Sequence, residues 1–115
     1  MQYMLLIYAD EANMAKSSQQ EMGQVMAAYG AYTEALKKAG ALVSADRLKS
    51  VTTATTVRVA DGKTQVLNGP YAEAKEQLGG YYLIEAPDLD AAIAWAARCP
   101  GASMGSMEVR PVWQM

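Results

Sequence analysis

The chain has 115 residues, 51% hydrophobic and 19% charged, a composition typical of one globular domain. Ten lysines and arginines against twelve aspartates and glutamates leave a formal net charge of −2. Since no basic excess is present to hold a phosphate backbone, we expect no direct nucleic-acid binding. The sequence contains no histidine and one cysteine, which excludes histidine-dependent triads, histidine or cysteine-cluster metal sites and an internal disulfide. We expect neither a metal nor a cofactor.

The longest apolar runs are short. Residues 3–9 and 91–97 each span seven residues, whereas a membrane-spanning helix needs about 20. No basic residue precedes the first run, so a signal peptide is not expected. These observations predict a cytoplasmic protein without membrane contact.

The first two elements are indicated by their hydrophobic patterns. Residues 3–8 are apolar on both alternating faces, which predicts a strand covered on two sides. Residues 17–39 predict a long helix, with Ser17 or Ser18 as its cap, Glu21 completing a capping box and Gly40 ending it. Its apolar residues recur at spacings of three and four: Met22, Val25, Met26, Tyr29, Tyr32 and Leu36.

The rest of the chain alternates strands and turns before a second helix. Residues 41–45 predict a short strand and residues 46–53 a loop. The β-prone runs 55–59 and 64–67 flank Asp61-Gly62, which predicts a hairpin. A turn at 68–71, a strand at 81–85, a helix capped by Asp88 and a strand at 107–112 follow. The eight methionines are interpreted as filler of the core.

This order of elements predicts the fold class. Strands interleaved with two helices in one domain, residues 1–115, favour an α+β protein. We expect a ferredoxin-like antiparallel sheet with both helices on one face and an inserted hairpin. The other face then needs cover, and a homodimer that packs sheet on sheet would provide it.

Residues 68–85 read Asn-Gly-Pro-Tyr-Ala-Glu-Ala-Lys-Glu-Gln-Leu-Gly-Gly-Tyr-Tyr-Leu-Ile-Glu. This stretch resembles the signature of the DGPF-domain branch of the YCII-related family: Asp-Gly-Pro-Phe, then Ala-Glu-x-Lys-Glu, then a Gly-Gly-Tyr strand. Residues 3–8, 53–59 and 108–111 also resemble the family. The chain departs from the signature at Asn68 and Tyr71, which stand where Asp and Phe are usual.

The resemblance implies a dimeric α+β barrel and no assigned reaction. Some members of the family are encoded beside, or fused to, sigma factors of the extracytoplasmic-function type. A His-Asp pair proposed as catalytic in the wider family has no counterpart here, since the chain lacks histidine.

Candidate ligand-binding residues each have a purely structural alternative. Asn68, Gly69, Pro70 and Tyr71 can line a pocket or simply form a turn, with Gly69 at positive φ.

Charged and phenolic residues form the second group of candidates. Glu73, Lys75 and Glu76 can bind a substrate or form a solvated helical turn. Asp46 and Arg47 can orient a polar substrate or pair with each other. Tyr81 can donate a hydrogen bond to a ligand or pack at an interface.

Three functions remain open from the sequence. The first is binding, or conversion, of an unknown small molecule in a cleft near residues 68–78, with catalytic residues unknown. The second is an accessory or regulatory module that acts by protein contact with a sigma-factor-linked protein. The third is a structural dimer with a degenerate site, which the change to Asn68 favours.

Overall fold

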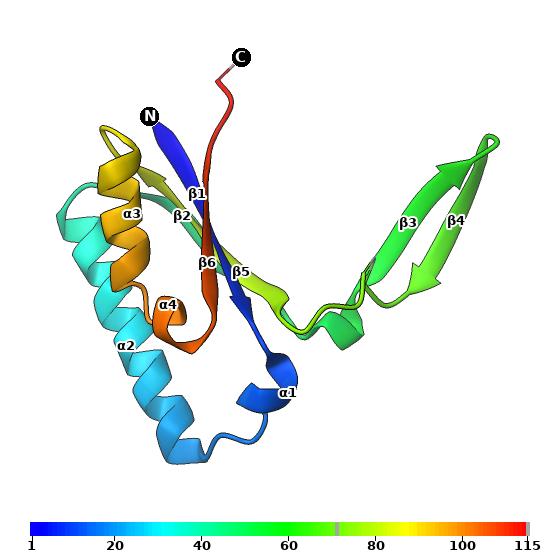
Figure 1. Ribbon diagram of the computed structural model, residues 1–115, viewed down its shortest axis with the longest axis horizontal. Coiled ribbons are helices and arrows are strands. Elements are labelled where there is room, and N and C mark those ends of the chain that lie inside the picture. The colour runs from blue at the N-terminus through cyan, green and yellow to red at the C-terminus, as the bar shows by residue number, and fades with distance from the viewer. Residues whose placement is uncertain (71, 115) are drawn as a thin grey trace.

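The computed structural model describes residues 1–70 and 72–114. Figure 1 shows the elements in chain order: β1 (Gln2–Ala9), α1 (Glu11–Met14), α2 (Gln19–Lys38), β2 (Leu42–Arg47), the short 3-10 helix η1 (Val51–Thr53), β3 (Thr55–Ala60), β4 (Lys63–Asn68), β5 (Gln77–Glu85), α3 (Leu89–Arg98), α4 (Gly101–Met104) and β6 (Ser106–Pro111).

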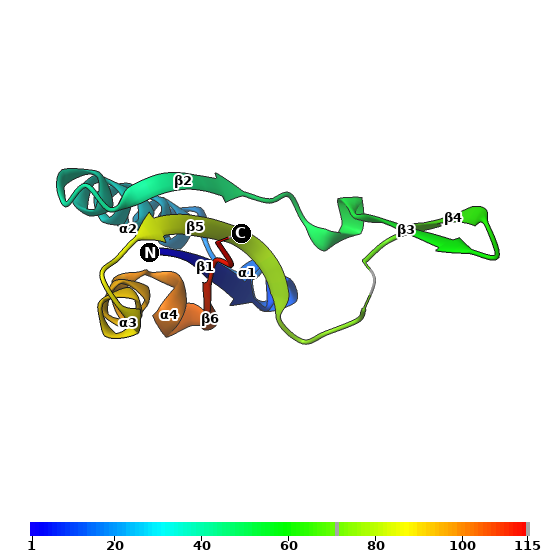
Figure 2. The same ribbon diagram turned by 90° about the horizontal axis from the view of Figure 1, so that it is seen from above.

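The main sheet has four antiparallel strands in the order β2-β5-β1-β6. This is the strand order of a ferredoxin-like fold, with β3 and β4 inserted as a separate hairpin between its second and third strands. In Figure 2 the helices α2, α3 and α4 lie on one side of the sheet. The predicted α+β class and the placement of both long helices on one face are confirmed.

Strand β1 at the centre of the sheet alternates between the two faces. Tyr3 and Leu5 are buried under the helices, whereas Met4 and Leu6 are only half-buried on the opposite face. Leu5 pairs with Tyr82 across to β5, which extends the buried layer into that strand. The doubly apolar strand predicted from the sequence therefore has one covered face and one open face in the single chain.

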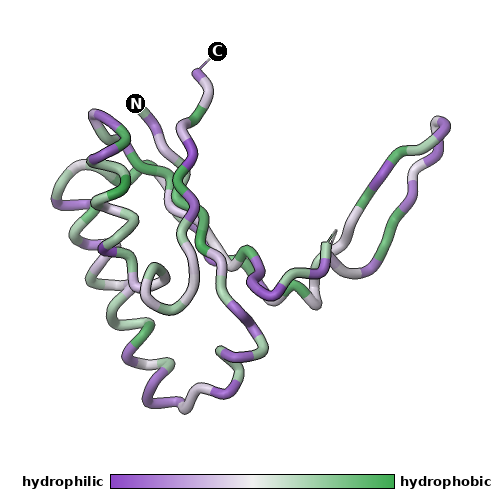
Figure 3. Tube along the Cα trace, viewed as in Figure 1, coloured by the Kyte–Doolittle hydropathy of each residue, from purple (hydrophilic) through white to green (hydrophobic). Residues whose placement is uncertain are grey.

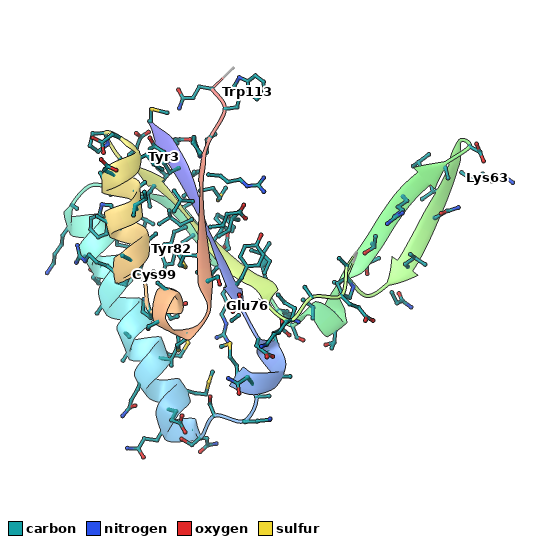
Figure 4. All side chains as sticks on the ribbon, in the orientation of Figure 1. Tyr3, Lys63, Glu76, Tyr82, Cys99 and Trp113 are labelled. Carbon is teal, nitrogen blue, oxygen red and sulfur yellow. The ribbon has the colours of Figure 1, made fainter. Side chains whose placement is uncertain are left out.

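Tyr32 joins the two long helices to the sheet. Its hydroxyl donates a hydrogen bond to the backbone oxygen of Trp95 in α3 at 2.7 Å. Its ring meets the ring of Tyr82 edge to face with centroids 5.1 Å apart, and that of Trp95 at 6.2 Å. Figure 4 shows Tyr3, Tyr82 and Cys99 in the layer between sheet and helices. Aromatic edge contacts of this kind stabilise a core beyond their buried area.

Helix α2 begins as the sequence predicts. The Ser18 hydroxyl accepts from the backbone N–H of Glu21, and the Glu21 carboxylate accepts from that of Ser18, a complete capping box. The helix is followed by Gly40 at φ +70°, the left-handed conformation expected of a glycine stop. Along its length, however, only Tyr32 and Leu36 are buried. The core contact of α2 is thus confined to its carboxyl-terminal half.

The β3–β4 hairpin projects away from the sheet (Figure 1). Asp61 and Gly62 at its tip have φ values of +53° and +74°, as a tight two-residue hairpin turn requires. The radius of gyration is 16.1 Å, against roughly 13 Å for a compact domain of this length. Figure 3 shows hydrophobic segments on both hairpin strands, and Val57 and Val66 pair directly while more than half exposed.

Several boundaries differ from the predictions. Strand β2 continues through Arg47, so the loop that follows it begins later than predicted. The short helices α1, η1 and α4 were not expected. Strand β5 begins at Gln77 and includes both glycines of its motif. A Cβ at Gly80 would lie 2.9 Å from the backbone oxygen of Asp46, so the glycine allows β2 to approach. Among the described helices, none has the length and apolar character to cross a membrane.

Gly105 permits a closer contact still. A Cβ there would lie 2.1 Å from the backbone oxygen of Tyr8. We expect Gly105→Ala to lower the free energy of unfolding by about 2 kcal/mol, since the backbone must shift to relieve the overlap. Gly30→Ala in the middle of α2 is the matched control; its Cβ meets nothing within 4 Å, and the change should raise stability by roughly 0.5–1 kcal/mol. If guanidinium titrations gave the same change in the free energy of unfolding for both variants, the steric explanation for Gly105 would be contradicted.

Buried acids predict a loss of stability at alkaline pH. Burial raises the pKa of Tyr32 and Tyr82 above the ordinary 10.0, and that of the Cys99 thiol above 9.0. As the pH rises, the unfolded chain therefore loses these protons before the folded chain does. The contribution of the three groups to the free energy of unfolding is fully present below about pH 9 and falls as the pH rises further. Guanidinium titrations at about pH 7 to pH 11 measure this decline. A free energy of unfolding that stays constant over that range would contradict it.

Candidate functional site

Two of the hollows formed by the described residues are considered as sites for a small molecule. The first, which we name the helix–sheet cavity, has a volume of about 640 Å³ and lies between α2, the short helices α1 and α4, and the strands β1, β2 and β5. The second, the hairpin-base cleft, is a more open hollow of about 710 Å³ where the β3–β4 hairpin leaves the main sheet. Glu76 marks its place in Figure 4.

The helix–sheet cavity exists because the first half of α2 does not reach the sheet. Apolar residues of α2 that the periodicity assigned to a packed face line this space. Four methionines contribute to the lining: Met14, Met22, Met26 and Met104. None of the methionines among the described residues is fully buried, and of these Met107 packs against the core, so the interpretation as core filler holds for Met107 and is wrong for the others. Methionine side chains are flexible and polarizable, which suits the wall of an adaptable apolar site.

Hydroxyl groups deep in the cavity are satisfied by one another. The hydroxyls of Thr33 and Tyr82 are hydrogen-bonded at 2.8 Å, and the Thr33 hydroxyl lies 2.8 Å from the backbone oxygen of Tyr29. Burial raises the pKa of Tyr29 far above its ordinary value, with a smaller contribution from Cys99. These phenols are therefore neutral at physiological pH, and they hold the wall of the cavity in place.

Two acids among the residues around the cavity also have partners. Glu11 accepts hydrogen bonds from the Ser50 hydroxyl at 2.7 Å and from the Val51 backbone N–H at 3.2 Å. On the face of the sheet opposite to Arg47, Asp46 accepts from the Tyr81 hydroxyl at 2.6 Å, and this bond raises the pKa of Tyr81. The contact made by Glu11 ties α1 to η1 and so closes one end of the cavity.

Arg47 differs from these acids. Its Nη1 lies 3.5 Å from the Met26 sulfur, and it forms no ion pair with a carboxylate of the residues described. Neighbouring side chains of a strand point to opposite faces, which separates Arg47 from Asp46. The two do not pair with each other, the alternative considered from the sequence.

The predicted ligand-binding residues do not lie together: some belong to the helix–sheet cavity, one belongs to the hairpin-base cleft, and others line neither. Asp46, Arg47 and Tyr81 contribute to the helix–sheet cavity, and Pro70 to the hairpin-base cleft. Four others line neither hollow: Asn68, Gly69, Glu73 and Lys75. Tyr71 lies outside the described residues.

The turn before residue 71 has the backbone that the sequence predicts. Gly69 has φ +116°, its N–H donates to Ala54 at 2.7 Å, and its carbonyl accepts from the Thr56 hydroxyl at 2.9 Å. These bonds close the base of the hairpin. Residues 72–76 form no helical turn, and the Glu76 carboxylate accepts from the Ser106 hydroxyl at 2.7 Å.

Sequence reasoning missed most of the helix–sheet cavity. The α2 pattern identified Met22, Val25 and Met26 as one face, but periodicity does not distinguish residues in a packed core from residues that line a void. Met14 and Met104 lie on short helices that were not predicted. Among the described residues no group of three acidic, histidine or cysteine side chains could hold a metal ion.

Comparison with known proteins identifies the family. The protein-family model of the YCII-related domain matches residues 1–115 of this sequence. A relative in Rhizobium meliloti (strain 1021), itself an uncharacterized protein, is 41% identical over 114 residues, which is 97% of this chain and 92% of the relative. The chain belongs to the YCII-related family.

Proposed function

We propose that this protein binds a small, largely apolar organic molecule in the helix–sheet cavity. The observation that carries the proposal is a space of about 640 Å³ walled mainly by methionines and other apolar side chains. Monomeric proteins seldom expose large contiguous apolar surface, and such surface commonly marks a binding site. Ligand sites fall in the range of roughly 300–1,000 Å³ and combine apolar walls with a few polar groups.

The polar groups of the cavity support binding rather than a particular reaction. Glu11 accepts hydrogen bonds from the protein, and Thr33 is bonded to Tyr82. A general acid or base must reach the proton that it transfers, and these groups are occupied with structural partners. We therefore assign a ligand to the cavity and no catalytic residue.

The cavity is preferred to the cleft near residues 68–78 that the sequence suggested. The hairpin-base cleft overlaps that segment, but it is more open to solvent and lined largely by threonines and other small residues. Burial of a ligand's apolar surface provides most of its binding free energy, at about 25 cal/mol per Å². The more enclosed site offers more of this burial.

Methionine methyl resonances provide a direct test. In a protein labelled with ¹³C at the methionine methyls, octan-1-ol should shift the signals of Met14, Met22, Met26 and Met104. Met4, which lies on the open face of the sheet, is the internal control and should not move. Unchanged cavity signals at a saturating alcohol concentration, or a shift confined to Met4, would contradict the proposal.

A cavity-filling substitution sharpens the same test. Val25 lines the cavity, so Val25→Trp should occupy part of it and abolish the octanol-induced shifts. Val57→Trp is the matched control, because Val57 is 59% exposed on the hairpin. It should leave the shifts unchanged. Circular dichroism of both variants establishes that they are folded.

We also propose that two copies pair through the open face of the sheet. Met4, Leu6 and Leu83 form a half-buried apolar centre there. Beside it the Tyr8 hydroxyl donates to Glu108 at 3.2 Å, and Glu108 also accepts from an arginine of the same strand. An apolar centre with a polar rim is the usual anatomy of an interface. A two-fold axis would place the same patch on both partners.

Light scattering measures this pairing. The protein should have the mass of a dimer at micromolar concentration, and Leu6→Glu should give a folded monomer, since pairing would bury an uncompensated carboxylate from each copy. Ile93→Glu is the matched control, because Ile93 is 48% exposed on α3. It should remain dimeric. A folded monomeric parent protein at this concentration would refute the proposed pairing.

Membership of the DGPF branch and the association with a sigma factor stay predictions from the resemblance of residues 68–85. The functional proposal depends on neither of them.

A further inference from the structure

We propose that the ligand of the helix–sheet cavity is an organic anion, an apolar chain or ring that ends in a carboxylate, and that Arg47 binds this carboxylate at the mouth of the cavity. This inference rests on the proposed function, because it names the chemical class of the molecule that the cavity takes up. It adds a charge requirement that an apolar cavity by itself does not impose.

The position of Arg47 places a cation at the edge of an apolar space. The residue ends β2, is exposed to solvent and contributes to the cavity lining. Opposite it, Gly80 in β5 carries no side chain, and Met26 of α2 lies on the other side. A group bound to the guanidinium could therefore keep contact with water while the remainder of the ligand extends between α2 and the sheet.

The guanidinium has hydrogen-bonding capacity to spare. In the described part of the chain its one hydrogen bond runs from Nη1 to the thioether sulfur of Met26 at 3.5 Å. A thioether is a weak acceptor, whereas a guanidinium offers five N–H donors in a planar fork. This fork matches the two oxygens of a carboxylate and can bind both of them.

The acids near Arg47 do not satisfy it. Asp46 is bound to Tyr81, and Glu11 to the backbone and hydroxyl of the loop that follows β2. A hydrogen bond from a neutral donor leaves a carboxylate charged, but neither acid forms an ion pair with Arg47, whose guanidinium has no carboxylate partner among the described residues. A ligand with one negative group would neutralise it without placing a further charge among the methionines.

The rest of the lining limits the polar groups that the bound anion can carry in addition to its carboxylate. Thr33 and Tyr82 are hydrogen-bonded to each other, so the interior offers few free partners for hydroxyl or amide groups. Burying polar groups without hydrogen bonds costs free energy. The lining thus favours a body of hydrocarbon and disfavours a sugar, a nucleotide or a peptide.

A matched pair of probes tests the charge requirement. Octanoate and octan-1-ol share an eight-carbon chain and differ in the terminal group, and calorimetric titration gives the dissociation constant of each. We expect octanoate to bind at least tenfold more tightly at neutral pH. A charge-assisted hydrogen bond is strong enough to produce a preference of this size.

Removal of the cation should erase the preference. In Arg47→Gln we expect the affinity for octanoate to fall at least tenfold, to that of octan-1-ol, and the affinity for the alcohol to stay the same. Arg58→Gln is the matched control, since Arg58 lies on β3 of the hairpin and lines neither of the described hollows. It should retain the preference of the parent protein.

The outcomes separate the two proposals. If both probes bind with equal affinity and Arg47→Gln changes neither constant, the anion requirement is wrong while the cavity remains a binding site. If neither probe binds the parent protein and no cavity methionine signal shifts, the proposed function itself is wrong. An octanoate preference that survives Arg47→Gln would overturn the role of Arg47.

Discussion

The contact that the rest of this structure depends on is the insertion of Tyr32 between the sheet and α3. One side chain contacts the ring of Tyr82 in β5 and the ring and backbone of Trp95 in α3. Together with the fully buried Leu36 it fixes the second half of α2 on the sheet. Through this one side chain the two long helices contact each other as well as the sheet. The free half of α2 gains its position from the same anchor, because a helix is rigid over this length.

The anchoring of α2 at one end has a functional consequence. The first half of the helix stands away from the sheet, and the space below it is closed by α1, α4 and the loop after β2 instead of by a packed core. The bonds of Glu11 to Ser50 and Val51 hold this closure together. A fold of this size thereby keeps an apolar cavity beside its core, and Arg47 supplies the unpaired charge that makes the cavity selective in our account.

Local signals predicted the elements well, and long-range geometry explains what they missed. Ser18 with Glu21 and Asp61 with Gly62 act within a few residues, so the capping box and the hairpin turn could be recognised directly. The cavity depends on the tilt of α2 relative to the sheet, which no local pattern of residues records. Hydrophobic periodicity is such a local pattern, and it therefore assigned Met22 to a packed face although this residue lines the cavity. The extension of β2 through Arg47 depends on Gly80 in a strand more than 30 residues away.

A crystal structure of the purified protein tests the central claim most directly, because it shows the cavity in the assembled state. We predict that the space beside Met22, Met26 and Met104 is open, or holds density for a molecule that is not part of the chain. Side chains of the same protein that fill this space, whether from a collapsed α2 or from a neighbouring copy's hairpin, would contradict the account. The cavity would then be part of the packing of the protein and not a binding site.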